Sequence, residues 1–239
     1  MIARLLGAIQ FLTTAPIRAR TASPGASAVF FPLVGCAIGA IGGVLLLALR
    51  QAVPPGIAAL VVLAFWAMLT GGLHEDGFAD VADAFRAGRP PERIHAILKD
   101  SRIGAHGALA LILITLLRWQ ALTALAAPPV LVLAATIATS RAAIVALAWV
   151  APPVGSGLGL EFSRDLTSAC VLAALAQAGL VLFFAPAGLL LAWGACLIVA
   201  AATPYFRRRI GGITGDCLGS TALLVETWGF TLYSCQRCM

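Results

Sequence analysis

The chain has 239 residues, of which 61% are hydrophobic and only 11% are charged, and its formal net charge is +6. Soluble globular domains carry about 25% charged residues, so this composition excludes an ordinary soluble domain. Nucleic-acid binding would need a soluble basic face, and the sequence shows none, so we expect no nucleic-acid partner. We therefore predict an all-α, polytopic integral membrane protein whose main surroundings are the lipid bilayer.

Apolar segments follow one another along the whole chain. A helix needs about 20 apolar residues to cross the hydrocarbon core, and these runs lack the alternating pattern of a membrane β-barrel. Residues 1–15 predict a short interfacial helix that is too brief to span. Proline at 128–129 and at 186 ends one helix and opens the next, which predicts two tight helical hairpins. The predicted spans, about seven, are 29–49, 55–73, 103–126, 128–150, 166–184, 186–206 and 213–233.

These spans predict one membrane-embedded domain over residues 1–239, in which the last segment either spans or re-enters. Basic residues that flank spans mark the cytoplasmic side. With the N-terminus inside, twelve basic residues lie in the cytoplasm and only Arg50 and Arg237 lie outside. This asymmetry explains the positive charge without a special ligand. It predicts an integral protein of the cytoplasmic (inner) membrane, with most of its acidic residues facing the cytoplasm.

Four of the ten acidic residues fall within nine positions, at Glu75, Asp76, Asp80 and Asp83. The spacing i, i+4, i+7 puts Asp76, Asp80 and Asp83 on one face of a helix, where like charges repel. No basic residue lies among them, so we expect a cation from outside the chain. Hard oxygen ligands suit Mg²⁺ or Mn²⁺. The alternative is a solvated helix that binds nothing.

Two further segments on the predicted cytoplasmic face carry polar groups. In "KDSRIGAHG", residues 99–107, the side chains of Lys99, Ser101 and Arg102 supply hydrogen-bond donors that could bind a phosphate beside a helix start. Ordinary anchoring at the membrane edge is the other interpretation. In "RRRIGGITGDCLGS", residues 207–220, four glycines surround Asp216, although three arginines are most often a topological signal. Glycine in membrane helices serves close packing or an irregular backbone.

Ionisable residues inside the predicted spans are functional candidates by default. Glu226 and Arg141 are such residues, and pairing with each other would satisfy both. Arg118 is expected to snorkel toward the membrane edge. His74 borders the carboxylates and is a candidate base. The glycine-rich loop 152–162 lies on the same predicted face, but it is no Walker loop and is a weak signal on its own.

The arrangement of charges favours an enzyme over the other classes. A transporter normally places ionisable residues near the midplane, often in paired repeats, and the acidic motif has no second copy. Metal-assisted phosphoryl transfer on a phosphorylated cytoplasmic substrate fits better, with Mg²⁺ neutralising a diphosphate. Prenyl transfer also pairs aspartates with Mg²⁺ and stays open as an alternative. So do a small-molecule transporter and a purely structural membrane subunit.

Five sequence blocks resemble those of the cobalamin synthase (adenosylcobinamide-GDP ribazoletransferase) family and lie in that family's order. They are "AIQFLTTAPI" at 8–17, "FFPLVG" at 30–35, "GGLHEDGFADVAD" at 71–83, "KDSRIG" at 99–104 and "GGITGDCLG" at 211–219. The chain departs from the family pattern at Glu75, where an apolar residue is expected. That carboxylate either adds charge near the metal or faces solvent.

The resemblance implies transfer of adenosylcobinamide phosphate from adenosylcobinamide-GDP to the 5-hydroxyl of α-ribazole, or of its phosphate, with release of GMP and with Mg²⁺ as cofactor. The resemblance leaves the oligomeric state open. Three groups of residues are then expected to carry the reaction. The metal ligands are Asp76, Asp80 and Asp83; the substrate-binding residues are Lys99, Ser101, Arg102 and Arg141; the catalytic residues are Asp216, His74 and Asp83.

Overall fold

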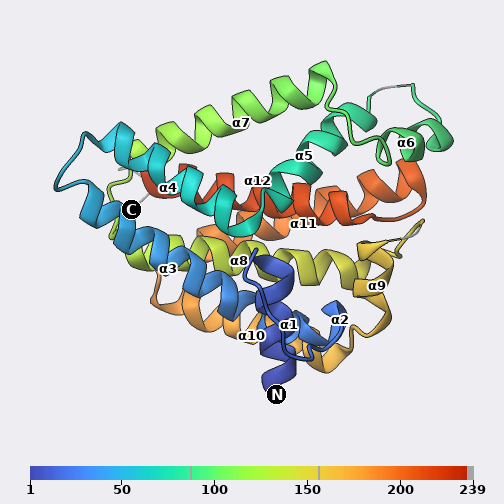
Figure 1. The fold of residues 1–239 in the computed structure, drawn as a ribbon, viewed down its shortest axis with the longest axis horizontal. Helices are drawn as coiled ribbons and strands as arrows, with labels where there is room; N and C mark the ends of the chain where they lie inside the picture. Colours follow the sequence, from blue (N-terminus) through green and yellow to red (C-terminus); the bar gives the residue numbers. More distant parts are fainter. Residues whose placement is uncertain (87, 156, 236–239) are drawn as a thin grey trace.

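The computed structural model describes residues 1–86, 88–155 and 157–235. Its helices lie side by side in one bundle, with α8 and α12 running through the middle of Figure 1. Helical bounds are α1 Ile2–Leu12, α2 Pro24–Ser27, α3 Phe31–Leu49, α4 Pro55–Thr70, α5 Leu73–Ala84, α6 Pro91–Ile97, α7 Ala105–Thr123, α8 Pro129–Val150, α9 Leu158–Arg164, α10 Ser168–Phe184, α11 Gly188–Ile210 and α12 Gly215–Ser234, with a short 3-10 turn at Ala28–Phe30.

The predicted class, an all-α membrane bundle, is confirmed. Within the described residues, four helical stretches are long and apolar enough to cross a membrane, or up to five if the bent pair α4–α5 is one span. Each of the seven predicted segments contains one long helix, and both predicted hairpins break at their prolines. The number of spans and the cytoplasmic N-terminus stay predictions. Arg237, which entered the orientation argument, lies outside the described residues.

Helix α8 is the most buried of the four membrane-length stretches and packs against α3, α10, α11 and α12. Its contact with α3 is made through a ridge of glycines, Gly35, Gly39 and Gly43, spaced every four residues. A Cβ atom added to Gly39 would lie 2.2 Å from the carbonyl oxygen of Leu133 on α8. Small residues at this spacing let two membrane helices approach backbone to backbone.

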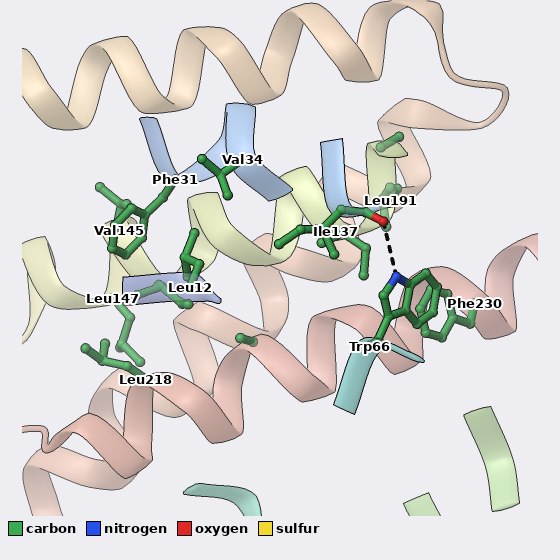
Figure 2. Close-up of a cluster of buried hydrophobic side chains, with 14 of the residues drawn as sticks. Leu12, Phe31, Val34, Trp66, Ile137, Val145, Leu147, Leu191, Leu218 and Phe230 are labelled. Atoms are coloured by element: carbon green, nitrogen blue, oxygen red, sulfur yellow. Dashed lines mark hydrogen bonds between the residues drawn. The ribbon is translucent and has the colours of Figure 1, made fainter. Parts of the chain in front are cut away.

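The side chain of Trp66 connects α4 with α3 and α12. The Trp66 indole donates a hydrogen bond of 3.1 Å to the carbonyl oxygen of Ile38, and its ring stacks on Phe230 of α12 at 5.5 Å between centroids (Figure 2). The same buried cluster contains Leu12 of α1 and Leu218 of α12. The short first helix therefore docks its last turn onto the core.

The break between α4 and α5 sets the direction of the acidic motif. Gly71 and Gly72 both adopt left-handed backbone angles, with φ of 66° and 67°. Glycine takes this conformation without the steric cost that a Cβ atom imposes. The two glycines turn the chain through 90°, so that α5 leaves the direction of α4 and packs along α7 and α12.

Candidate active site

Helix α5 carries the acidic motif, as predicted, and lies directly against the start of α12. At Gly77 a Cβ atom would be only 3.0 Å from the Cα atom of Asp216. A larger residue at position 77 would hold the two helices apart. The structure thus brings together Asp76 and Asp216, which are 140 residues apart in the sequence (216 minus 76).

A cleft with two adjoining parts opens over this contact. The first part has a volume of about 310 Å³ and is lined by His74, Asp76, Lys99 and Asp216, together with Phe11 and Thr214. The second part, of about 570 Å³, is lined by Asp76, Asp80 and Ser101. Phe11, Leu73 and Asp76 line both parts, so the two are continuous. Most of the predicted site residues therefore face one space.

The carboxylates in the cleft are close enough to act on each other. Asp80 experiences the charges of Asp76, Asp83 and Asp216. In the part of the chain that the structure describes, however, no three His, Cys, Asp or Glu side chains come close enough to hold a metal ion by themselves. A cation held here by one or two carboxylates would complete its coordination with other oxygen atoms, such as those of water or of a substrate phosphate.

Asp83 has a different environment from the other two aspartates of its face. Its carboxylate accepts hydrogen bonds from the backbone amides of Gly104, at 2.6 Å, and Gly107, at 2.9 Å. These amides lie at the N-terminus of α7, where an acidic side chain satisfies free N–H groups and the helix dipole. In the structure Asp83 caps α7, and its predicted metal and catalytic roles stay predictions.

Two of the three residues predicted to bind phosphate in segment 99–104 line the cleft. Lys99 lines the first part and Ser101 lines the second. Arg102 instead forms an ion pair of 2.7 Å with Asp100, and 86% of its side chain is exposed. Arg102 would have to exchange this partner in order to bind a phosphate.

The ion pair of Asp100 with Arg102 stays intact over the neutral pH range. Hydrogen bonds from the Arg102 guanidinium lower the pKa of Asp100 to about 2. Because the pKa is lowered in the folded protein, the pair is present above the ordinary value of 3.8 and is lost only as pH falls toward 2. We expect the Asp100→Asn variant to keep the wild-type shape of the pH–rate profile between about pH 5 and 8, since Asp100 does not titrate there. A shifted profile would contradict this.

The two candidate bases sit on opposite helices of the first part. Asp216 lies in the first turn of α12, and one carboxylate oxygen accepts a hydrogen bond of 3.1 Å from the Thr214 hydroxyl. His74 is 3% exposed, and its Nε2 atom has no hydrogen-bond partner. Both residues line the cleft, although the Nε2 atom of His74 is itself buried.

Behind His74 lies a cluster of four charged side chains from four helices, which we call the ion-pair cluster: Glu75, Arg118, Arg141 and Glu226. Three of them are buried, and the Glu75 side chain is 24% exposed. Glu226 on α12 accepts hydrogen bonds from Arg118 on α7 at 2.7 Å and from Arg141 on α8 at 2.5 Å. Arg118 also donates to Glu75 on α5 at 2.8 Å. The two positive and two negative charges balance, which is the condition for burying charge at tolerable cost.

This cluster confirms one sequence expectation and corrects another. Arg141 pairs with Glu226, as considered from the sequence. Arg118 does not snorkel: it is 4% exposed and bridges two carboxylates, because partners inside the bundle satisfy it better than the membrane edge could. Glu75 does not merely face solvent, since it pairs with Arg118. Whether its carboxylate also adds charge near a metal stays a prediction.

Arg141, predicted to bind substrate, is only 2% exposed. Its guanidinium contacts Ser140 and Glu226, and among the described residues it lines a small internal void next to His74 instead of the cleft. Its substrate-binding role therefore stays a prediction. The structure itself shows Arg141 inside the protein, one layer behind the cleft wall.

Several cleft residues had no predicted role. Phe11 belongs to the "AIQFLTTAPI" block and stacks on Phe31 at 5.2 Å between ring centroids. Val154 and Gly155 come from the glycine-rich loop that was a weak signal. An isolated parallel bridge between Pro153 and Ile213 holds this loop against the segment before α12. Both this loop and the segment before α12 are rich in glycine, and that shared composition was the sequence signal that could have predicted their contact.

The fold and this cleft define a helical membrane protein with a polar site, rich in carboxylates, at the junction of α5, α7 and α12. The family model described as "Cobalamin-5-phosphate synthase" matches residues 4–234. The chain belongs to this family. No solved structure matches it.

Named relatives agree with the family match. The chain is 31% identical to an adenosylcobinamide-GDP ribazoletransferase of Acetivibrio thermocellus, over 96% of each chain. It is 37% identical to the protein of that name in Chlorobaculum tepidum, over 95% of this chain and 92% of the relative. It is 41% identical to the one in Rhizobium etli, over 82% of this chain and 80% of the relative.

Proposed function

We propose that this protein transfers the adenosylcobinamide phosphate group from adenosylcobinamide-GDP to a free ribose hydroxyl of α-ribazole or of its 5-phosphate, and releases GMP. The printed names of relatives that match most of the chain support this activity. The observation that carries it in this molecule is the cleft in which Asp76 and Asp216 face Lys99. Such a site suits a substrate with a diphosphate whose charge needs both a cation and a basic side chain.

The donor set of the cleft fits Mg²⁺. This ion prefers hard oxygen ligands, keeps several waters, and is held through one or two carboxylates together with substrate phosphates. Asp76 and Asp80 line the second part of the cleft, with Asp216 in the adjoining first part. The absence of a complete protein cage in the described residues is consistent with this mode of binding. When bound, Mg²⁺ would neutralise the diphosphate and stabilise the charge that builds up on the leaving phosphate.

The protein's own side chains then have separate tasks. Lys99 and Ser101 bind phosphate oxygens from the wall opposite α5, and Arg102 joins them after leaving Asp100. The acceptor hydroxyl oxygen forms the new bond to the cobinamide-side phosphorus while the bond from that phosphorus to GMP breaks. Asp216, oriented by Thr214, takes the hydroxyl proton, with His74 as the competing base.

We further propose that the cleft opens to the cytoplasm and that the protein resides in the inner membrane. The excess of basic residues at the flanks of the apolar segments on one side supports this orientation. The proposed donor is a charged nucleotide derivative, which would be available on that side. The alternatives, another Mg²⁺-dependent phosphoryl or prenyl transferase or a transporter, lack such support from the named relatives.

The decisive test uses purified protein in detergent with adenosylcobinamide-GDP and α-ribazole, with and without Mg²⁺. We expect stoichiometric GMP and cobalamin product with Mg²⁺, and no product in excess EDTA, restored by adding Mg²⁺ back. Substrate that binds but leaves unchanged would point to a transporter. Activity that survives EDTA would remove the metal from the proposal and leave the transferase assignment intact.

A further inference from the structure

An apolar groove lies on the outer face of the bundle, away from the cleft residues. Helices α8, α10 and α11 line it, and its volume is about 540 Å³. Its floor is made of small side chains, Ala142, Ala143, Ala178 and Ala195. At Gly179 an added Cβ atom would have no neighbour within 4 Å, so nothing from the described residues fills the space above it. The groove has the size and apolar lining of a ligand site.

One end of the groove leads to a pair of positive charges. Thr203 and Pro204 line that end, and Arg207 and Arg208 follow them by one helical turn on the same two ridges of α11. Both arginines are exposed. The third arginine of the run, Arg209, is committed elsewhere, because it donates to the backbone oxygens of Phe85 and Arg86 beyond the end of α5.

Exposed aromatic residues lie at this same end of the bundle. Trp149, in the last turn of α8, is 50% exposed, and Tyr205 on α11 is 43% exposed. The bridge from Pro153 to Ile213 shows that α8 and α11 finish close together. Trp and Tyr gather where membrane hydrocarbon meets the headgroups. The apolar groove would then lie at acyl-chain depth, with Arg207 and Arg208 at headgroup depth.

We propose that this groove binds an anionic phospholipid, with an acyl chain between α8, α10 and α11 and its phosphate at Arg207 and Arg208. Clusters of basic residues next to a membrane helix attract anionic lipid headgroups. Charge decides between a lipid and a second copy of the chain. A symmetric copy would bring two further arginines to the same end and repel the first pair, whereas an anionic headgroup neutralises them.

The experiment measures lipid preference by stability. Detergent-purified protein is titrated with dioleoyl-phosphatidylglycerol or dioleoyl-phosphatidylcholine, and bound lipid is counted by native mass spectrometry while Tm is recorded. We expect phosphatidylglycerol to raise Tm by about 4 °C or more beyond phosphatidylcholine at saturation, with one lipid retained. The doubly substituted Arg207→Gln/Arg208→Gln protein should lose this difference. Gly179→Phe, which fills the open space, should reduce retention of both lipids.

The matched control is Arg4→Gln/Arg20→Gln, which removes two exposed arginines near the N-terminus. This variant should keep the wild-type preference. Equal loss in the control, or no preference in the wild type, would overturn the proposal. If the groove instead joins two copies of the chain, Gly179→Phe would convert a dimer into a monomer whatever lipid is present, and this result would also overturn the proposal. Each variant's Tm in phosphatidylcholine reports whether it has folded.

Discussion

Asp80→Asn and Asp76→Asn are each expected to lower the rate of GMP release by about a hundredfold or more, because a bound metal ion contributes several kcal/mol of charge stabilisation in phosphoryl transfer. Asp76 lines both parts of the cleft and Asp80 lines the second part. Asparagine keeps the size of each side chain while it removes the negative charge. The loss should therefore reflect the missing charge.

The measurement pairs the steady-state rate with binding of Mn²⁺ followed by electron paramagnetic resonance. Both variants should bind Mn²⁺ at least about tenfold more weakly than the wild type, since even outer residues of metal sites carry effects of this order. Asp165→Asn is the matched control, because it makes the same chemical change on an exposed residue outside the cleft lining. Unchanged Mn²⁺ binding together with lost activity would assign the two aspartates to some other task.

Among the single substitutions proposed, Glu226→Gln is expected to lower the free energy of unfolding most. The substitution leaves Arg141 with only the Ser140 hydroxyl and a carboxamide, and leaves Arg118 with Glu75 alone. Removing one partner of a buried ion pair costs about 3–5 kcal/mol, because a charge stays buried without compensation. For a chain of this length that corresponds to a fall of about 10 °C in Tm. Thermal unfolding in detergent measures it.

A double substitution separates charge from packing. Arg141→Leu/Glu226→Leu removes one positive and one negative charge together and keeps the pair of Arg118 with Glu75, so it should regain more than half of the stability lost in Glu226→Leu alone. Glu92→Gln, on the exposed first turn of α6, should leave Tm unchanged. A double variant no more stable than Glu226→Leu would show that side-chain volume matters more than charge balance at this position.

Local patterns in the sequence predicted the helices well because apolar length and proline are strong signals. The breaks at Pro128 and Pro186, and the helical face shared by Asp76 and Asp80, follow from spacing alone. The direction of α5 was harder to predict. It depends on two consecutive left-handed glycines, and Gly71 and Gly72 could equally have served close packing.

The roles of the charged residues were less predictable, because they depend on which helices become neighbours. Asp83 shares a face with Asp76, yet it meets the amides of Gly104 and Gly107 and caps α7. Arg118 looked like a residue near a membrane edge until α5 and α12 supplied it with two carboxylates. No spacing rule relates positions 75, 118 and 226, since their contact is a property of the bundle.

The cleft described above draws its walls from both termini of the fold. Phe11 belongs to α1, whereas Thr214 and Asp216 belong to the start of α12, and all three line the same part. During synthesis, therefore, the binding space cannot be completed until the ribosome has delivered the last helix. A nascent chain that has inserted only its earlier helices would already hold the acidic α5, but without α12 beside it Arg141 would lack its carboxylate partner Glu226 and Arg118 would have Glu75 alone.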